Sequence, residues 1–217
     1  MRTQKLNSLS EENHEHDRFN VALQDDISRN LSQHGWSQAD NFLPQELCLS
    51  LAQECLHLHA QGQMRLAQVG SAKTRTLQSD IRRDQIAWLQ NGQSAACDRY
   101  LAIMENLRLH LNRDCFLGLE DYESHFALYR PGAFYRAHVD RFRDDDRRTV
   151  SVVIYLNQDW RGEHGGALRL YPEGQSVQDI SPEACRLVVF MSADILHEVL
   201  PATRDRLSLA GWFRRRV

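Results

Sequence analysis

The chain has 217 residues, of which 42% are hydrophobic and 25% are charged. This length suits one domain with an ordinary hydrophobic core, and it excludes a disordered chain or a small domain that depends on disulfides. The net charge of −3 gives no general attraction to phosphate backbones or anionic lipid, so neither nucleic acid nor membrane is an expected partner.

Cysteine usage and hydropathy indicate a cytoplasmic location. The five cysteines are odd in number and contain no C-x-x-C, which predicts reduced thiols rather than a disulfide framework or a zinc ribbon. The chain contains no apolar run of about 18 residues, and its first residues lack the apolar stretch of a signal peptide.

Residues 1–20 are polar and aperiodic, so we expect a flexible tail. The remainder, residues 21–217, is expected to form a single domain, with a helical part over 21–117. Asn41 or the residues after it could cap a first helix. Apolar residues recur at helical spacing in two stretches, the first with Pro44, Leu47, Leu51, Cys55 and Leu58, the second with Tyr100, Leu101, Met104, Leu107 and Leu111.

After Gly118 the pattern becomes strand-like. Short apolar or alternating runs cover 126–129, 149–156, 167–171, 186–190, 197–200 and 207–213, with Gly and Pro between them. Helices first and strands afterwards, without alternation, predict an α+β protein in which helices back an antiparallel barrel or sandwich. This strand-rich core is expected over residues 118–217.

His138, Asp140 and His197 are the candidate metal ligands. Residues two apart in a strand point to the same face, so His138 and Asp140 could bind one ion together with a histidine from a neighbouring strand. Two imidazoles and one carboxylate are the ligands of many non-haem Fe(II) sites. Alone, an H-x-D pattern and a distant histidine are coincidence more often than a metal site.

Two further residues suggest an anion pocket beside those ligands. In the last strand Leu207 and Leu209 share one face, so Arg206 points to the opposite face, which in a barrel is the cavity. A buried guanidinium needs an anion, and a bidentate carboxylate fits it. Tyr155 faces the same cavity and brings a hydroxyl. The alternatives are a surface arginine and a core tyrosine.

Beyond these arguments, residues 129–212 resemble the Fe(II)- and 2-oxoglutarate-dependent prolyl 4-hydroxylases, especially the hypoxia-sensing type and its bacterial relatives. The resemblance rests on Tyr129-Arg-Pro-Gly, His138-Val-Asp140, Val-Ile-Tyr155-Leu-Asn-Gln-Asp-Trp160, Gly165-Gly-Ala-Leu-Arg-Leu-Tyr-Pro-Glu-Gly174 and His197-Glu-Val-Leu-Pro201 with Arg206 and Trp212. The segment Asp80-Ile-Arg82-Arg-Asp84-Gln-Ile-Ala-Trp88 resembles the one that precedes the mobile substrate loop of that subfamily.

The resemblance implies a double-stranded β-helix (jelly roll) core with supporting N-terminal helices, and a role for each matching residue. His138, Asp140 and His197 match the iron ligands. Residues matching the 2-oxoglutarate site are Arg206, Tyr155, Tyr129 and Trp212. Residues matching the substrate groove are Arg82, Asp84, Trp88 and Arg148, with loops around residues 70–90 bringing the target alongside.

The implied activity is hydroxylation of a prolyl residue in a protein, with O2 consumed and succinate and CO2 formed. Fe(II) and O2 are the implied cofactors, 2-oxoglutarate is the cosubstrate, and ascorbate is a further candidate. A translation component is the favoured protein substrate. The alternatives are an oxygenase of the same fold acting on a small molecule or nucleic acid, and a non-catalytic metal-binding jelly roll.

Overall fold

The structure is a computed structural model that describes residues 21–67, 80–141 and 146–216. The tail expected over residues 1–20 lies outside this range, as do residues 70–79 of the substrate-positioning loops expected around residues 70–90. Within the described residues, no helix is both long and apolar enough to cross a membrane.

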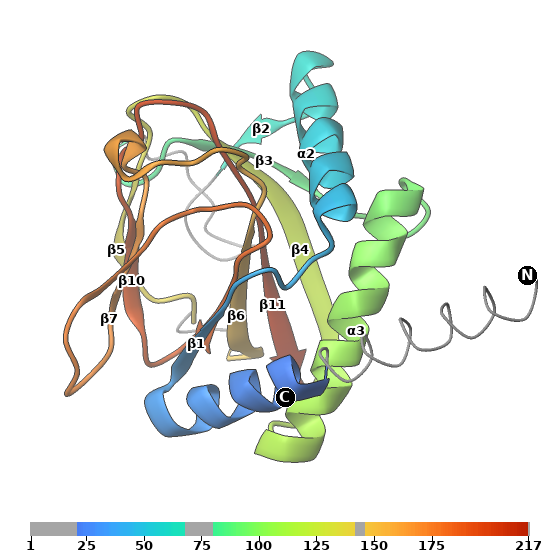
Figure 1. Cartoon of the computed structure of the whole chain (residues 1–217), viewed down its shortest axis with the longest axis vertical. Coiled ribbons are helices and arrows are strands. Elements are labelled where there is room, and N and C mark those ends of the chain that lie inside the picture. The colour runs from blue at the N-terminus through green and yellow to red at the C-terminus, as the bar shows by residue number, and fades with distance from the viewer. Residues whose placement is uncertain (1–20, 68–79, 142–145, 217) are drawn as a thin grey trace, which may run out of the picture.

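Two antiparallel sheets face each other and form the core (Figure 1). The larger sheet has seven strands in the order β1 (Trp36–Ala39), β9 (Leu187–Met191), β6 (Arg148–Tyr155), β11 (Arg206–Arg215), β4 (Leu119–Tyr129), β3 (Asp84–Trp88) and β2 (Arg65–Leu66). The smaller has four, in the order β5 (Tyr135–His138), β10 (Leu196–Val199), β7 (Leu168–Tyr171) and β8 (Gln178–Ile180). A short 3-10 helix spans Gly162–His164. The expected α+β jelly roll is confirmed.

Helices cover the outer face of the larger sheet, on the side away from the smaller sheet (Figure 1). They are the helix over residues 21–34, α2 (Gln45–Ala60) and α3 (Ala95–Cys115). The expected apolar stripe of α2 is buried and shares one core with Val150, Val152 and Ile154 of β6 and with Leu156, which follows the strand. The alternating pattern of β6 therefore fixes which of its faces meets the helices.

The expectation that residues 21–117 are helical is wrong in part. Three strands, β1, β2 and β3, interrupt this stretch, and β1 and β3 pair with β9 and β4 of the larger sheet. Each is short and its partners lie far along the chain, so local periodicity does not mark them. Asn41 is also not a helix cap, because α2 is capped at Pro44 without a side-chain hydrogen bond.

A second apolar cluster lies between the two sheets. Members from the larger sheet include Ala127, Tyr155, Val188 and Phe190, and members from the smaller sheet include Leu168 and Leu170. The predicted alternation of β6 holds here too, because Val153 and Tyr155 face this inner layer. The inner layer is not filled along its whole length, and the space that remains is the cavity described next.

Candidate active site

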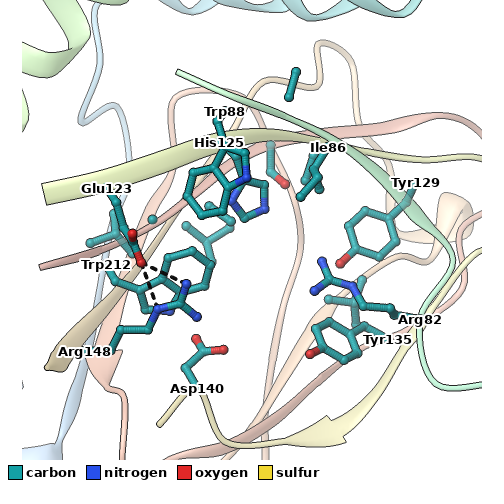
Figure 2. A pocket seen from close by; sticks show the side chains of 18 of the residues that line it. Arg82, Ile86, Trp88, Glu123, His125, Tyr129, Tyr135, Asp140, Arg148 and Trp212 are labelled. Atoms are coloured by element: carbon teal, nitrogen blue, oxygen red, sulfur yellow. Dashed lines mark hydrogen bonds and ion pairs between the residues drawn. The ribbon is translucent and has the colours of Figure 1, made fainter. Parts of the chain in front are cut away.

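A cavity of about 1080 Å³ opens between the two sheets. One wall is built from facing residue pairs of β4 and β11, in which every second residue points inward. The pairs in register are Arg206 with Tyr129, Ser208 with Ala127, Ala210 with His125, and Trp212 with Glu123. Figure 2 shows His125, Trp88 and Trp212 on one side of this space and Arg82, Tyr129 and Tyr135 on the other.

The three predicted metal ligands come together at the smaller sheet. His138 and His197 are directly paired between β5 and β10, and Asp140 follows two residues after His138. One ligand atom from each of the three residues lies within 4.8 Å of the others. The Nε2 atoms of His138 and His197 lie 3.5 and 3.7 Å from the Asp140 carboxylate oxygens.

The route by which Asp140 reaches this cluster differs from the expectation. His138 is the last residue of β5, and Asp140 lies beyond the strand in a bend, with its backbone N–H donating to the Ser192 carbonyl. The two side chains therefore meet through a turn of the backbone rather than through strand alternation. The predicted pairing with a histidine from the neighbouring strand does occur.

Surrounding hydrogen bonds hold the three groups ready for a cation. The Nδ1 atoms of His138 and His197 bond the carbonyls of Arg136 and Ile195, at 2.8 and 3.1 Å, which leaves each Nε2 facing the cluster. Ser151 donates to Asp140 Oδ2 at 2.7 Å. Burial opposes ionisation of Asp140, but the two imidazoles and Ser151 hold the pKa of its carboxyl well below its usual range. Burial lowers the pKa of His197 to about 4, so its ring is neutral near pH 7.

Arg206 is a buried cation that has no carboxylate partner among the described residues. Its side chain is only 1% exposed, and Nε donates to the Gly166 carbonyl at 2.8 Å. Arg206 Nη2 and the Tyr155 hydroxyl are both buried without a hydrogen-bond partner. Burial raises the pKa of Tyr155 to about 12, so the hydroxyl remains a donor. Together the two groups form a receptor for an anion that enters the cavity.

Tyr129 and Trp212 lie along the same wall. The Arg206 guanidinium carbon lies 5.2 Å from the centre of the Tyr129 ring and 5.0 Å from that of Tyr155. Trp212 lies at the other end of the wall, with its indole Nε1 buried and without a partner. Tyr129 is therefore beside the Arg206 guanidinium, whereas Trp212 is farther along β11.

Arg82 and Asp84 bind each other through two short hydrogen bonds, of 2.7 and 2.6 Å. Asp84 is 1% exposed and does not line the cavity, whereas Arg82 does. The guanidinium of Arg82 lies over the Tyr135 ring at 4.4 Å, and that ring stacks on His138 with centroids 3.6 Å apart. Asp84 therefore orients Arg82. Arg82 in turn packs on the Tyr135 ring, and that ring packs on the predicted metal ligand His138.

Arg148 and Trp88 lie at the opposite side of the cavity. Arg148 pairs with Glu123 at 2.9 Å, and its guanidinium covers the Trp212 ring at 3.4 Å (Figure 2). Glu123 also accepts from Arg214 at 2.8 Å. Trp88 is 41% exposed at the rim. All four predicted groove residues are thus ordered around one cavity, three of them as lining.

The donor set and the pocket fit one class of enzyme. Two neutral imidazoles and one carboxylate on one side of an ion are the ligand set of non-haem Fe(II) sites, and the remaining side faces the cavity. The unpartnered Arg206 and Tyr155 atoms fit a dicarboxylic cosubstrate that also reaches the metal. Fold and site together define a jelly-roll oxygenase that uses Fe(II) and a 2-oxo acid.

Comparison with known proteins gives the same class and narrows it. The 2OG-Fe(II) oxygenase superfamily model matches residues 124–214. A crystal structure of a Pseudomonas putida prolyl-4-hydroxylase is 52% identical, with a TM-score of 0.82, and covers 89% of this chain and 100% of that one. A Trichoplax adhaerens prolyl hydroxylase, in complex with a hypoxia inducible factor oxygen degradation domain peptide fragment, is 28% identical with a TM-score of 0.83, covering 92% of both chains.

Curated relatives agree with these structures. Prolyl hydroxylase EGLN3 of Mus musculus is 30% identical over 192 residues, which are 84% of this chain and 80% of the relative. Egl nine homolog 1 of Mus musculus is 33% identical over 193 residues, and the match covers 84% of this chain and 47% of the relative. The chain thus spans about half the length of that relative. The chain belongs to the prolyl hydroxylase family of the 2OG-Fe(II) oxygenase superfamily.

Several residues of the cavity were not singled out from the sequence. They include Glu123 and His125 on β4. Two residues outside the lining were also not assigned a role: Gly166, whose carbonyl accepts from Arg206, and Ser192, which bonds Ser151 and the Asp140 backbone N–H. The alternation that places Tyr129 inward also places Ala127, His125 and Glu123 inward, so the signal for the β4 residues was present. It was missed because the strand was predicted to begin at residue 126, whereas it begins at Leu119.

Proposed function

We propose that this protein hydroxylates a prolyl residue in a protein substrate, using Fe(II), 2-oxoglutarate and O2, and that it forms succinate and CO2. The observation that carries the proposal is the buried guanidinium of Arg206, which lines the same cavity as the His138, Asp140 and His197 cluster and has the unpartnered Tyr155 hydroxyl group as its neighbour. A protein that only stored metal would need no such receptor.

In this proposal His138, Asp140 and His197 hold the iron through two Nε2 atoms and a carboxylate oxygen. Bound Fe(II), with 2-oxoglutarate and O2, supplies the oxidising chemistry that inserts one oxygen atom into a C–H bond. The chain fixes the ligands before the ion arrives, because Ser151 and the two backbone carbonyls already orient the side chains.

Arg206 binds the distal carboxylate of 2-oxoglutarate, and Tyr155 donates a second hydrogen bond to it. Both side chains are fixed on strands of the larger sheet, while the metal ligands lie on or beside the smaller sheet. The cosubstrate therefore spans the gap between the sheets. Tyr129 lies against the Arg206 guanidinium and keeps water from it. Trp212 forms the cavity wall farther along β11.

The substrate polypeptide occupies the outer part of the cavity. Trp88 offers an exposed aromatic surface at the rim, while Arg82 and Arg148 line the two sides. Arg82 is paired with Asp84, and Arg148 is paired with Glu123. Each guanidinium is therefore held in a fixed position and its charge is largely neutralised by its partner. In this proposal Asp84 acts on the substrate through Arg82.

The proposal extends to the setting of the reaction. We propose a cytoplasmic enzyme whose substrate is a component of the translation apparatus, with ascorbate keeping the iron reduced. Nucleic acid is not the substrate in this proposal, because a net charge of −3 offers no general attraction to phosphate.

The test is aerobic incubation of the protein with Fe(II), 2-oxoglutarate and a cell lysate, followed by mass spectrometry. We expect one added oxygen on a proline of a translation protein, accompanied by succinate and stimulated by ascorbate. The Asp140→Ala variant, with its fold checked by circular dichroism, is expected to produce neither. Succinate formed while every proline stays unmodified would instead identify an oxygenase for another substrate.

A further inference from the structure

His125 lies on the cavity wall and has no part in the metal or anion sites. It points inward from β4, opposite Trp88 on β3 and Ala210 on β11. The imidazole centroid lies 4.9 Å from that of Trp88 and 5.5 Å from that of Trp212 (Figure 2). The two indole centroids lie 6.3 Å from each other, so the three rings form one cluster whose packing fixes the position of the imidazole.

The imidazole is buried but incompletely hydrogen-bonded. His125 is 3% exposed, and its Nδ1 has no hydrogen-bond partner. This differs from His138 and His197, whose Nδ1 atoms each bond a backbone carbonyl. A buried polar atom without a partner destabilises the protein, so a ligand that satisfied it would gain affinity. The Nε1 of the adjacent Trp212 is a second buried polar atom without a partner.

His125 is uncharged near pH 7. Burial, reinforced by the positive charge of Arg82, lowers the pKa of its imidazole to about 3. A neutral imidazole donates at one nitrogen and accepts at the other, so it can bond either the N–H or the carbonyl of a neutral peptide group. The nearby charged groups Arg82 and Arg148 already have carboxylate partners in Asp84 and Glu123.

The cosubstrate does not reach this residue through its distal carboxylate. Arg206 is paired with Tyr129, and His125 lies four residues back along β4 from Tyr129. At about 3.3 Å per residue, this places His125 about 13 Å along the strand from the anion receptor. The ligand that meets His125 therefore enters from the outer part of the cavity, where Trp88 is exposed at the rim.

We propose that His125 recognises the substrate polypeptide through a hydrogen bond with a backbone peptide group beside the target prolyl residue. A peptide group offers a donor and an acceptor, which match an imidazole nitrogen and the Trp212 Nε1–H. Proline has no backbone N–H, so any hydrogen donated to His125 comes from a flanking residue. The inference rests on the proposed function, because it assumes that a polypeptide fills the outer cavity.

Three variants separate the hydrogen bond from the packing. His125→Phe keeps a planar ring against the two indoles and removes both nitrogens. His125→Asn keeps a polar atom one bond from Cγ, where Nδ1 stands. His57→Phe repeats the first substitution on the exposed face of α2, away from the cavity, and is the matched control.

Binding is measured without turnover, under nitrogen, with Fe(II) and 2-oxoglutarate present. The probe is a library of short peptides with one central proline and randomised flanks, from which the sequence retained best by the unmodified protein is synthesised. We expect His125→Phe to weaken binding of that peptide at least about tenfold, and His125→Asn to restore most of the loss. His57→Phe should match the unmodified protein, and affinity for 2-oxoglutarate should be unchanged in all variants.

The outcomes separate this inference from the proposed function. Equal peptide affinity for His125→Phe and the unmodified protein would overturn the inference, as would a loss of 2-oxoglutarate binding in both His125 variants, since that would mean a role in holding the wall. A protein that retains no library peptide overturns it as well. If the peptide binds but gains no oxygen when air is admitted, the proposed function fails. The relative peptide affinities of the variants would still test the role of His125.

Discussion

At the scale of single residues, Arg206 gives the clearest test of the cosubstrate site. Its Nη2 is buried without a partner, and charge-assisted hydrogen bonds are worth about 1.5–3 kcal/mol each. Because about 1.4 kcal/mol is a tenfold change, Arg206→Ala should weaken 2-oxoglutarate binding at least about tenfold. Calorimetry under nitrogen with Fe(II) present measures this directly.

The control for that measurement is Arg169→Ala. Arg169 also lies on a strand, β7, but it pairs with the carboxylate of Asp179 and its side chain is partly exposed. Exposed ion pairs contribute little, so this variant should bind 2-oxoglutarate like the unmodified protein. Unchanged affinity in Arg206→Ala would mean that the buried guanidinium does not hold the cosubstrate.

Gly166 is a second residue at which the site can be tested, because Gly174 has similar backbone geometry and serves as its control. Both have left-handed backbone, with φ of +72° and +69°. A Cβ at Gly166 would meet Ala202, Trp160 and the Arg206 side chain at 2.9–3.3 Å, whereas a Cβ at Gly174 meets nothing within 4 Å. Alanine at either position should cost about 1–2 kcal/mol in unfolding free energy from backbone strain.

Only the substitution at Gly166 should also disturb the site. Gly166→Ala pushes on the Arg206 side chain, so it should destabilise the fold further and weaken 2-oxoglutarate binding, while Gly174→Ala should leave that affinity unchanged. Chemical denaturation and calorimetry give the two quantities. Equal 2-oxoglutarate affinity in the two variants would show that Arg206 tolerates the closer approach.

At the scale of elements, the start of α3 rests on one side-chain cap. Ser94 has extended backbone, and its hydroxyl accepts from the Cys97 N–H at 3.2 Å. Ser94→Ala removes the partner of that N–H and should lower the unfolding free energy by about 1 kcal/mol. Ser50→Ala is the comparison, because Ser50 bonds back to the Glu46 carbonyl inside α2, where alanine is the better helix former. Equal destabilisation by the two substitutions would argue against the cap.

The elements also show what could be read from the sequence and what could not. The long alternating strands β6 and β11 were predicted within one or two residues, because one face of each is apolar and the other is not. Arg206 therefore faces the cavity as its strand pattern predicts, and Tyr155 lies in the inner apolar cluster; their roles stay predictions. β1, β2 and β3 were missed because they are short and are stabilised by partners distant in sequence.

The same contrast between local sequence pattern and long-range strand pairing decides which site residues could be predicted. His138 and His197 could be matched from sequence because they lie in recognisable motifs, although no local rule showed that Asp140 leaves the strand in a bend. His125 belongs to no motif, and its position follows only from the register of β4 with β3 and β11. Register over long sequence separations depends on the packing of the whole sheet.

At the scale of the whole molecule, the proposed ligands join the two sheets. The histidine ligands lie on β5 and β10 of the smaller sheet, while Arg206 and Tyr155 lie on β11 and β6 of the larger one. Fe(II) and 2-oxoglutarate bound together would therefore connect layers whose shared apolar cluster leaves a cavity of about 1080 Å³. The unfolded chain keeps no such site, so the ligands should stabilise the fold.

The expected size of that effect follows from mass action. Under nitrogen, 2-oxoglutarate at about one hundred times its dissociation constant should add about 2.7 kcal/mol to the unfolding free energy of the Fe(II)-loaded protein. For a chain of this length this corresponds to about 5–10 °C in Tm. Arg206→Ala should keep the shift caused by Fe(II) and lose most of the shift caused by 2-oxoglutarate, whereas His138→Ala should lose both. A 2-oxoglutarate shift that persisted in both variants would show that the acid binds elsewhere than between the sheets.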